Sequence, residues 1–392
     1  MRLGIYGGTF NPPHLGHIRA AAQALEALNL DRLLVIPDRI APHKVIPEGS
    51  PNPAQRLEMV QLATAAFSGM EASDLELRRE GPSYTYLTVE ALAREHPGDE
   101  LFLLMGTDMF LSFRSWRYPE RITAHAALAV FCRGEKGERE AIAEEKARME
   151  ERGIRVFLIQ NSVTAISSTD LRRMLVFRCA GEFLDPNVEQ YIYGHGLYGT
   201  GRDLRNLPVD LLQETVVSLL KPSRVNHVLG CRQAAVELAR LHGADETHAA
   251  RAALLHDITK ALDGPLQLTL CRSHGMILGE FSRKNPKTLH QTTGAVVAER
   301  IFGECPEVVE GIRYHTTGKA DMNLLQKIIY VADYMEPNRD FPGVEELRRL
   351  AHEDIDKALE LGLTMTIQML TQQGREISPE SREALAWLRK EE

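Results

Sequence analysis

Apolar and polar positions follow one another in two different ways along the chain, and the change falls near residue 200. Before it, short apolar runs alternate with stretches of helical periodicity, which is typical of buried parallel strands joined by helices. The predicted strands are Arg2–Tyr6, Leu33–Pro37, Leu101–Met105, Leu128–Cys132 and Arg155–Ile159. The helices between them include Gly16–Leu28, Pro53–Phe67 and Tyr86–Glu95. This alternation predicts a doubly wound α/β parallel sheet.

After residue 200 the apolar positions keep helical spacing, and no strand alternation is convincing. The predicted helical stretches are Val209–Leu220, Arg224–Leu241, Glu246–Leu262, Thr292–Phe302, Leu324–Met335 and Val344–Gln373. We therefore expect an all-α helical bundle. A segment rich in glycine and polar residues separates the two patterns, so we expect domains at 1–198 and 208–392 with a linker at 199–207.

Composition narrows the classes of partner and compartment. Of 392 residues, 44% are hydrophobic and 26% charged, and Lys+Arg 46 against Asp+Glu 54 gives a net charge of −8. Such a chain has no broad basic field for nucleic acid or an anionic membrane surface. The opening MRLGIYGGTF is unlike a secretory signal peptide, and no apolar stretch reaches the roughly 20 residues of a membrane span. Five scattered cysteines without a CxxC pair indicate reduced thiols, and we expect a cytoplasmic protein.

The first candidate for chemistry is the segment GIYGGTFNPPHLGH, which follows a predicted strand and opens a helix. Gly7 and Gly8 let the backbone approach a ligand, and the helix N-terminus supplies N–H donors. His14 and His17 are three residues apart, so they face the same side of the helix start. Two imidazoles there could neutralise charge on a triphosphate. The alternative is a Gly/Pro turn with two surface histidines.

A distant segment, AISSTDLRRML, has the composition of a second phosphate site. Ser167 and Ser168 precede a helical run, where hydroxyl groups cap N–H donors. Arg172 lies one turn into that helix and could reach β- and γ-phosphates. The alternative is an ordinary helix cap with a surface arginine.

Together these two segments resemble the HxGH class of nucleotidylyltransferases, and within that class the bacterial nicotinate-nucleotide adenylyltransferases. Four further strings carry the resemblance: IPDRIAPHK, SYTYLTVEAL, GTDMFLSFRSWR and YIYGHGLY. The similarity spans nearly all of residues 1–198 and implies a Rossmann-like sheet. Sister enzymes acting on phosphopantetheine share the two phosphate segments, whereas Tyr84, Thr85 and Trp116 separate this chain from them.

The resemblance implies transfer of AMP from ATP to nicotinate mononucleotide, giving deamido-NAD and pyrophosphate with Mg²⁺ on the triphosphate. His14, His17 and Arg172 would be the catalytic residues. The ATP-binding residues it implies are Gly7, Gly8, Thr9, Phe10, His14, His17, Gly106, Asp108, Ser167, Ser168 and Arg172. Those for the nicotinate nucleotide are Lys44, Tyr84, Thr85 and Trp116, with the indole as a stacking platform. A core aromatic is the alternative for Trp116.

The second part holds a possible metal cluster. His227, the step His256–Asp257 and Asp333 occur in order in otherwise apolar helical surroundings, and His290 and His315 lie between them. Burying a His-Asp step is costly without a cation or partner. Imidazole and carboxylate donors without cysteine suit Fe²⁺ or Mn²⁺. Each of these residues taken alone is more simply a core or surface residue.

This ordered set resembles the HD phosphohydrolases, and more closely the bacterial HD-domain family that hydrolyses diadenosine tetraphosphate to two ADP. The matching strings, within about residues 207–355, are NHVLG, AALLHDITK, YHTTGKADMNLLQKIIYVADYMEPNR and FPGVEELR. By this resemblance an iron (or manganese) would be held by His227, His256, Asp257 and Asp333, and Asp257 would also be a catalytic residue. A second metal or the phosphates would contact His290, His315, Lys260 and Arg339.

The sequence thus predicts a bifunctional enzyme whose substrates are ATP, nicotinate mononucleotide and diadenosine tetraphosphate. Two alternatives stay open for the helical domain: another nucleotide substrate, such as guanosine tetraphosphate or a deoxynucleotide, or a non-catalytic nucleotide sensor. The preference between nicotinate and nicotinamide, and the formation of a homo-oligomer, also stay open.

Overall fold

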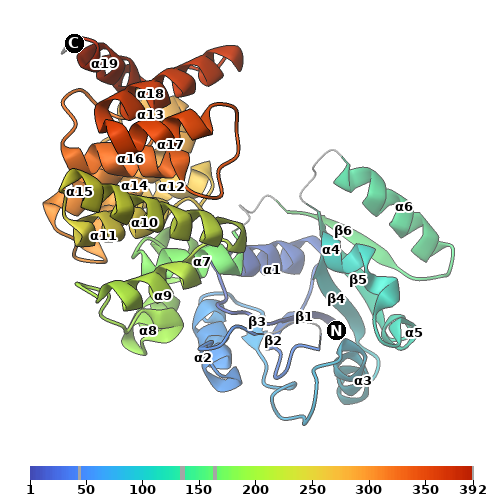
Figure 1. Cartoon of the computed structure of the whole chain (residues 1–392). Helices are drawn as coiled ribbons and strands as arrows, with labels where there is room; N and C mark the ends of the chain where they lie inside the picture. The colour runs from blue at the N-terminus through green and yellow to red at the C-terminus, as the bar shows by residue number, and fades with distance from the viewer. Residues whose placement is uncertain (43–45, 133–136, 162–165, 391–392) are drawn as a thin grey trace. The chain divides into compact units, whose positions relative to one another are not determined.

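The computed structural model describes residues 1–42, 46–132, 137–161 and 166–390, which form two compact units (Figure 1). The first comprises residues 1–176 and 180–202, and the second comprises 177–179 and 203–392. The first unit contains a sheet, whereas the described part of the second is helical, so the predicted fold class is confirmed. Within the described ranges no helix has the length and apolar character needed to cross a bilayer.

The sheet of the first unit has six parallel strands in the order β3-β2-β1-β4-β5-β6. Their bounds are β1 Arg2–Gly8, β2 Arg32–Pro37, β3 Met70–Ala72, β4 Glu100–Gly106, β5 Ala126–Cys132 and β6 Val156–Gln160. Sequence patterning missed β3 because this edge strand has three residues, of which only Met70 is buried. Strands β2 and β3 are added on one side of β1, and β4, β5 and β6 on the other, so the strand order switches between β1 and β4. In such sheets ligands bind at this point, beyond the carboxyl ends of the strands.

Helices cover both faces of the sheet. On one face a continuous apolar core joins the strands to α3 Thr85–Glu95, α4 Thr107–Leu111, α5 Pro119–Thr123 and α6 Glu138–Glu150. On the other lie α1 Leu15–Ala27 and α2 Pro53–Thr64. The unit ends with α7 Ser168–Val176 and α8 Pro186–Gly194. The charged helix α6 packs Ile142 and Met149 on the core and also buries Glu145, which pairs with Arg114 at 2.9 Å.

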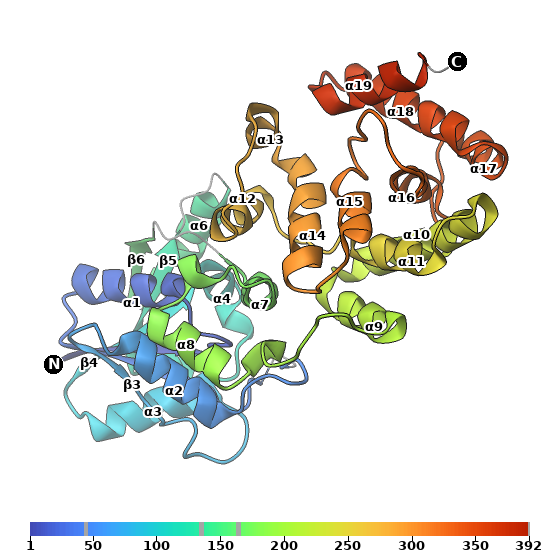
Figure 2. The ribbon, with the colours of Figure 1, turned by 90° about the vertical axis from the view of Figure 1, so that its left-hand side faces the viewer.

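The second unit is a bundle of helices with α10 and α11 side by side (Figures 1 and 2). The described helices are α9 Val209–Leu219, α10 Pro222–His242, α11 Glu246–Leu255, α12 Gly264–Ser273, α13 Glu280–Lys284, α14 Leu289–Arg300, α15 Pro306–Arg313, α16 Leu324–Met335, α17 Val344–Glu353, α18 Ile355–Gln372 and α19 Pro379–Leu388. Their apolar sides form the core, to which α11 contributes four fully buried residues, Ala249, Ala252, Leu254 and Leu255.

Two predicted helices of this unit are interrupted. The stretch 246–262 leaves the α-helix after Leu255, and the N–H groups of Ile258, Lys260 and Leu262 donate to carbonyls three residues back. The stretch 344–373 breaks at Asp354, whose extended backbone (φ −156°) lets its carboxylate cap α18. Both breaks lie inside uniform helical patterns, so periodicity alone could not locate them.

A buried ion pair, Arg56–Asp38, holds the carboxyl ends of β1 and β2 together. Arg56, on α2, has no solvent exposure and donates to the Asp38 carboxylate (2.9 Å), the Asp38 carbonyl (2.7 Å) and the Thr9 carbonyl (2.7 Å). The Thr9 hydroxyl donates to the other Asp38 oxygen at 2.8 Å. The pair therefore fixes the loop that leaves β1.

Replacing Arg56 by Met should destabilise the first unit by about 3–5 kcal/mol, because it leaves the Asp38 carboxylate buried without its cation. The measurement is urea unfolding followed by Trp116 fluorescence in a Trp387→Phe background. The control is Arg32→Met, which removes a surface pair with Glu71 and should change stability by no more than about 0.5 kcal/mol. Equal effects of the two substitutions would contradict this account of the loop.

Candidate nucleotide site and metal centre

The loop after β1 runs along the carboxyl edge of the sheet into α1. Gly7 and Gly8 end β1, and a side-chain atom added at Gly7 would meet nothing within 4 Å, so the backbone there is open to a ligand. Phe10 follows in a left-handed conformation (φ 46°). Its buried ring meets the rings of Tyr6 and His17 edge to face. This aromatic packing and the Asp38 contact of Thr9 give the loop a defined shape.

His14 and His17 stack at the start of α1, with ring centroids 3.6 Å apart. The His14 backbone N–H donates to Nδ1 of His17 (3.3 Å), so the proton of a neutral His17 ring sits on Nε2. Burial lowers the pKa of His14 to about 4, and no described residue bonds its Nδ1. Without a ligand, His14 is therefore neutral at pH 7, so in this state it offers hydrogen bonds to a phosphate rather than the charge that the sequence suggested.

Arg172, on α7, reaches this loop from the distant segment. Its Nη1 donates to the Asn11 carbonyl (2.9 Å) and its Nη2 to the Thr169 hydroxyl (3.1 Å). Ser167 caps α7 by accepting the Asp170 N–H at 3.0 Å, and Ser168 is the first residue of the helix. The structure thus places the helix N-terminus and a guanidinium beside the loop that leads to His14, which is the arrangement needed for an anion.

The remaining predicted residues of this unit lie at other places along the same sheet edge. Gly106 ends β4, and Asp108 is exposed in α4. Tyr84 and Thr85 begin α3, and the half-buried Trp116 contacts Phe113, with ring centroids 5.3 Å apart. These two segments meet, because the Arg117 guanidinium lies 4.7 Å from the centre of the Tyr84 ring. Lys44 lies outside the described residues.

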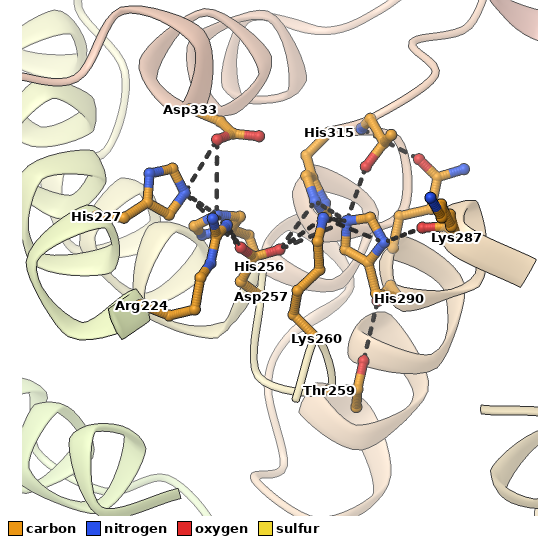
Figure 3. Close-up of polar contacts among 12 residues, drawn as sticks. Arg224, His227, His256, Asp257, Thr259, Lys260, Lys287, His290, His315 and Asp333 are labelled. Atoms are coloured by element: carbon orange, nitrogen blue, oxygen red, sulfur yellow. Dashed lines mark hydrogen bonds and ion pairs between the residues drawn. The ribbon is translucent and has the colours of Figure 1, made fainter. Parts of the chain in front are cut away.

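In the helical unit, the predicted histidines and aspartates converge from separate helices and turns (Figure 3). His227 lies within α10, Asp333 within α16 and His290 near the start of α14, while His256, Asp257 and His315 directly follow helices α11 and α15. All four imidazoles are at least nine-tenths buried. Side chains separated by up to 106 positions therefore share one site.

The Nδ1 side of each imidazole is fixed by a hydrogen bond. His256, His290 and His315 donate to the carbonyls of the residues three positions before them, at 2.7–2.8 Å. Nδ1 of His227 lies 3.2 Å from Oε1 of Glu336. Because Nδ1 of His256, His290 and His315 donates to a carbonyl, these rings in their neutral form present Nε2 lone pairs to the centre of the site, and Nε2 of His227 faces the same centre.

These lone pairs face one another at short range. Nε2 of His227 lies 3.3 Å from Nε2 of His256, and Nε2 of His290 lies 3.1 Å from Nε2 of His315. Burial lowers the pKa of His315 to about 4 and those of His256 and His290 well below their usual range. A cation between the paired Nε2 atoms would bind the lone pairs of both rings.

Asp257 lies between the two imidazole pairs. Its Oδ2 is 3.7 Å from Nε2 of His227 and 3.6 Å from that of His256. Its Oδ1 is 3.5 Å from Nε2 of His290 and 3.8 Å from that of His315. Oδ1 is buried and has no hydrogen-bond partner among the described residues. Asp333 Oδ1 lies 3.1 Å from His227 Nε2, so both carboxylates are aimed at the same centre.

Three cationic side chains surround these donors. Arg224 contacts the Asp257 carboxylate, Arg339 donates to the Asp333 carboxylate at 2.8 Å, and Lys260 lies 2.7 Å from Nε2 of His290. Burial lowers the pKa of Lys260 to about 8, so it is still mostly protonated at pH 7. Arg224 was not predicted from the sequence, although it lies one turn before His227 on α10. The three cations could contact phosphate oxygens at the site.

Cys231 lies near the cluster but is not oriented as a ligand. Its Sγ is 3.6 Å from Nε2 and 3.9 Å from Nδ1 of His227. Because these distances are nearly equal, the sulfur lies beside the ring rather than in line with the Nε2 lone pair. The remaining imidazole nitrogens and carboxylate oxygens fit a divalent metal ion, and they include the buried Asp257 Oδ1, which accepts no hydrogen bond from the described residues and lies 3.6 Å from Nζ of Lys260.

Comparisons with known proteins match the two parts of the chain to two different families. Residues 5–174 match the cytidylyltransferase-like family, and residues 224–338 match the HD domain. A probable nicotinate-nucleotide adenylyltransferase from Desulfatibacillum aliphaticivorans is 37% identical over 219 residues, which is 50% of this chain and 100% of that protein. A second, from Shewanella sp. (strain ANA-3), is 37% identical over 212 residues, with 50% and 99% covered.

Two solved structures are also similar to parts of the chain. A crystal structure of a predicted HD superfamily hydrolase involved in NAD metabolism, from Clostridium acetobutylicum, has 35% identity and a TM-score of 0.46, covering 47% of this chain and 99% of that one. Nicotinic acid mononucleotide adenylyltransferase from Plasmodium falciparum has 20% identity and a TM-score of 0.42, with 51% and 98% covered.

The first unit is assigned from its 37% identity over the full length of a curated relative. The HD match of the second unit includes its four buried histidines. The chain belongs to the nicotinate-nucleotide adenylyltransferase family, and in it a cytidylyltransferase-like domain is followed by an HD domain of the metal-dependent hydrolase type.

Proposed function

We propose that residues 1–198 transfer AMP from ATP to nicotinate mononucleotide. An oxygen of the mononucleotide phosphate attacks the α-phosphorus of ATP, the bond to the β-phosphate oxygen breaks, and deamido-NAD and pyrophosphate result. The observation that carries this proposal is the Arg172 hydrogen bond to Asn11, which joins the two phosphate segments. Both curated relatives named above are probable nicotinate-nucleotide adenylyltransferases.

The residues of this site act by positioning and by hydrogen bonding, which suits a phosphoryl transfer without a covalent intermediate. Gly7 and Gly8 bring the backbone close to the phosphates, and the N-terminus of α7 with Ser168 receives their charge. His17 donates from Nε2, and Arg172 binds the leaving pyrophosphate. Mg²⁺ on the triphosphate would offset its negative charge.

Recognition of the nicotinate part is assigned to the segments that begin α3 and follow α4. The Trp116 indole offers a stacking face for the pyridine ring, and the Thr85 backbone offers an N–H group to its carboxylate. Tyr84 and Lys44 complete the proposed set, and Thr9, Phe10, Gly106, Asp108 and Ser167 line the ATP side.

Replacing His17 by Ala should lower the rate of deamido-NAD formation about 100-fold, because it removes one hydrogen-bond donor to the transition-state phosphates. The rate is measured by chromatography with ATP, Mg²⁺ and nicotinate mononucleotide. His195→Ala, an exposed histidine of the same unit, is the control and should retain the parent rate. Equal rates for the His17 variant and the parent would refute the assignment.

For residues 208–392 we propose metal-dependent hydrolysis of diadenosine tetraphosphate. Water attacks a phosphorus of the central P–O–P linkage, that linkage breaks, and two ADP are released. A bound Fe²⁺ or Mn²⁺ would lower the pKa of a coordinated water and stabilise the developing charge. The proposed ligands are His227, His256, Asp257 and Asp333, and the observation that carries the proposal is the placement of the buried Asp257 carboxylate between the two imidazole pairs, within 3.5–3.8 Å of all four Nε2 atoms.

The cations of the site favour a polyphosphate as substrate. Arg224, Lys260 and Arg339 contact the carboxylates or imidazoles of the cluster, so phosphate oxygens entering the site would meet all three. His290 and His315 would hold a second metal ion or contact a phosphate. Guanosine tetraphosphate or a deoxynucleotide would use the same contacts, and a nucleotide sensor would bind without turnover.

The full-length protein with Mn²⁺ should convert diadenosine tetraphosphate to ADP alone, because the central linkage is the one cleaved. Asp257→Ala should lower this rate more than about 100-fold through loss of a metal ligand. Products are identified by anion-exchange chromatography, with the exposed Asp210→Ala as control. Release of AMP and ATP would contradict symmetrical cleavage, and binding without turnover by the parent would favour the sensor.

A further inference from the structure

Glu336 lies behind His227, on the side away from the centre of the metal site. It ends α16, three residues after Asp333, and is 1% exposed. Its Oε1 is 3.2 Å from Nδ1 of His227, whose Nε2 is 3.1 Å from Asp333. The residue was not predicted from the sequence, where it directly follows the predicted helix Leu324–Met335.

Other contacts hold the Glu336 carboxylate and backbone in place. Its Oε2 accepts hydrogen bonds from the backbone N–H of Asn338 (2.7 Å) and from the Asn338 side chain (2.8 Å). Arg348, on α17, donates to the carbonyls of Met335, Glu336 and Arg339 at 2.9–3.0 Å. The segment after α16 is therefore tied to α17.

Gly230 provides the space in α10 for this carboxylate. It lies one turn after His227, and a side-chain carbon added there would be 2.2 Å from Oε2 of Glu336 and 2.9 Å from the Asn338 side chain. A glycine inside a helix costs about 1 kcal/mol relative to alanine. At this position only glycine leaves room for the Glu336 carboxylate against the helix.

The position of His227 in its helix explains why it needs a carboxylate partner. His256, His290 and His315 lie at helix ends, and their Nδ1 atoms donate to carbonyls three residues back. Helix ends and turns leave such carbonyls available. His227 lies inside α10, where carbonyls accept the helix's own hydrogen bonds. Its Nδ1 proton therefore requires an acceptor from another element.

We propose that Glu336, seated against Gly230, is a positioning residue that holds the Nδ1 proton of His227 and so directs the Nε2 lone pair to the metal. The inference rests on the proposed metal site. Partners of this kind orient histidine ligands, and their loss typically lowers metal affinity 10–100-fold. Glu336 does not touch the proposed substrate or ion itself.

The test is Mn²⁺ affinity of the metal-stripped full-length chain, measured by electron paramagnetic resonance of the free ion. Glu336→Ala should weaken binding about 10–100-fold, and Glu336→Gln should weaken it less because its amide oxygen can still accept from Nδ1. Gly230→Ala should also weaken binding by displacing the carboxylate. If it acts through Glu336, it should add little in the Glu336→Ala background.

Two further measurements separate positioning from folding. Nitrogen-15 NMR of the metal-free chain should show His227 with its proton on Nδ1 in the parent and a shift towards Nε2 in Glu336→Ala. Glu304→Ala removes another buried carboxylate, one that pairs with Arg251, and should leave Mn²⁺ affinity unchanged. Unchanged affinity in Glu336→Ala would overturn this inference alone, whereas no Mn²⁺ binding by the parent would contradict the metal site itself.

Discussion

The helical unit depends on one electrostatic constraint: four buried imidazoles and two carboxylates are held with their donor atoms facing a common centre. The hydrogen bonds that orient them come from behind, through Nδ1, and leave Nε2 directed inwards. Lone pairs separated by 3.1–3.3 Å gain nothing from one another. A bound cation would bring these donors together, and its binding would then stabilise the fold of this unit.

In the α/β unit the candidate site would bind a ligand of the opposite charge. Its proposed ligand is an anion, and the candidate donors are backbone N–H groups, imidazoles and the Arg172 guanidinium near the carboxyl edge of a parallel sheet. The Arg56–Asp38 pair beneath them fixes the loop before a ligand arrives. In both units the residues that face the ligand are held by buried polar contacts from neighbouring elements.

Much of this organisation could be predicted from the sequence, because apolar runs and helical spacing report directly on burial. Motif residues such as His14, Arg172, His256 and Asp333 could be named in advance. The three-residue strand β3 and the helix break at Asp354 could not be predicted, because neither one changes the spacing of apolar residues around it. Arg56, Arg224 and Glu336 act through contacts with distant residues, and nothing in their own segments distinguishes them from surface charges.

We propose that the inward-facing donors of the helical unit bind a metal ion. Anomalous diffraction at the iron absorption edge, from crystals of the full-length protein grown with Fe²⁺, tests it most directly. The account predicts a peak within bonding distance of Nε2 of His227 and His256 and of the carboxylates of Asp257 and Asp333. An ordered site without a peak there, in crystals that show iron bound elsewhere, would contradict it.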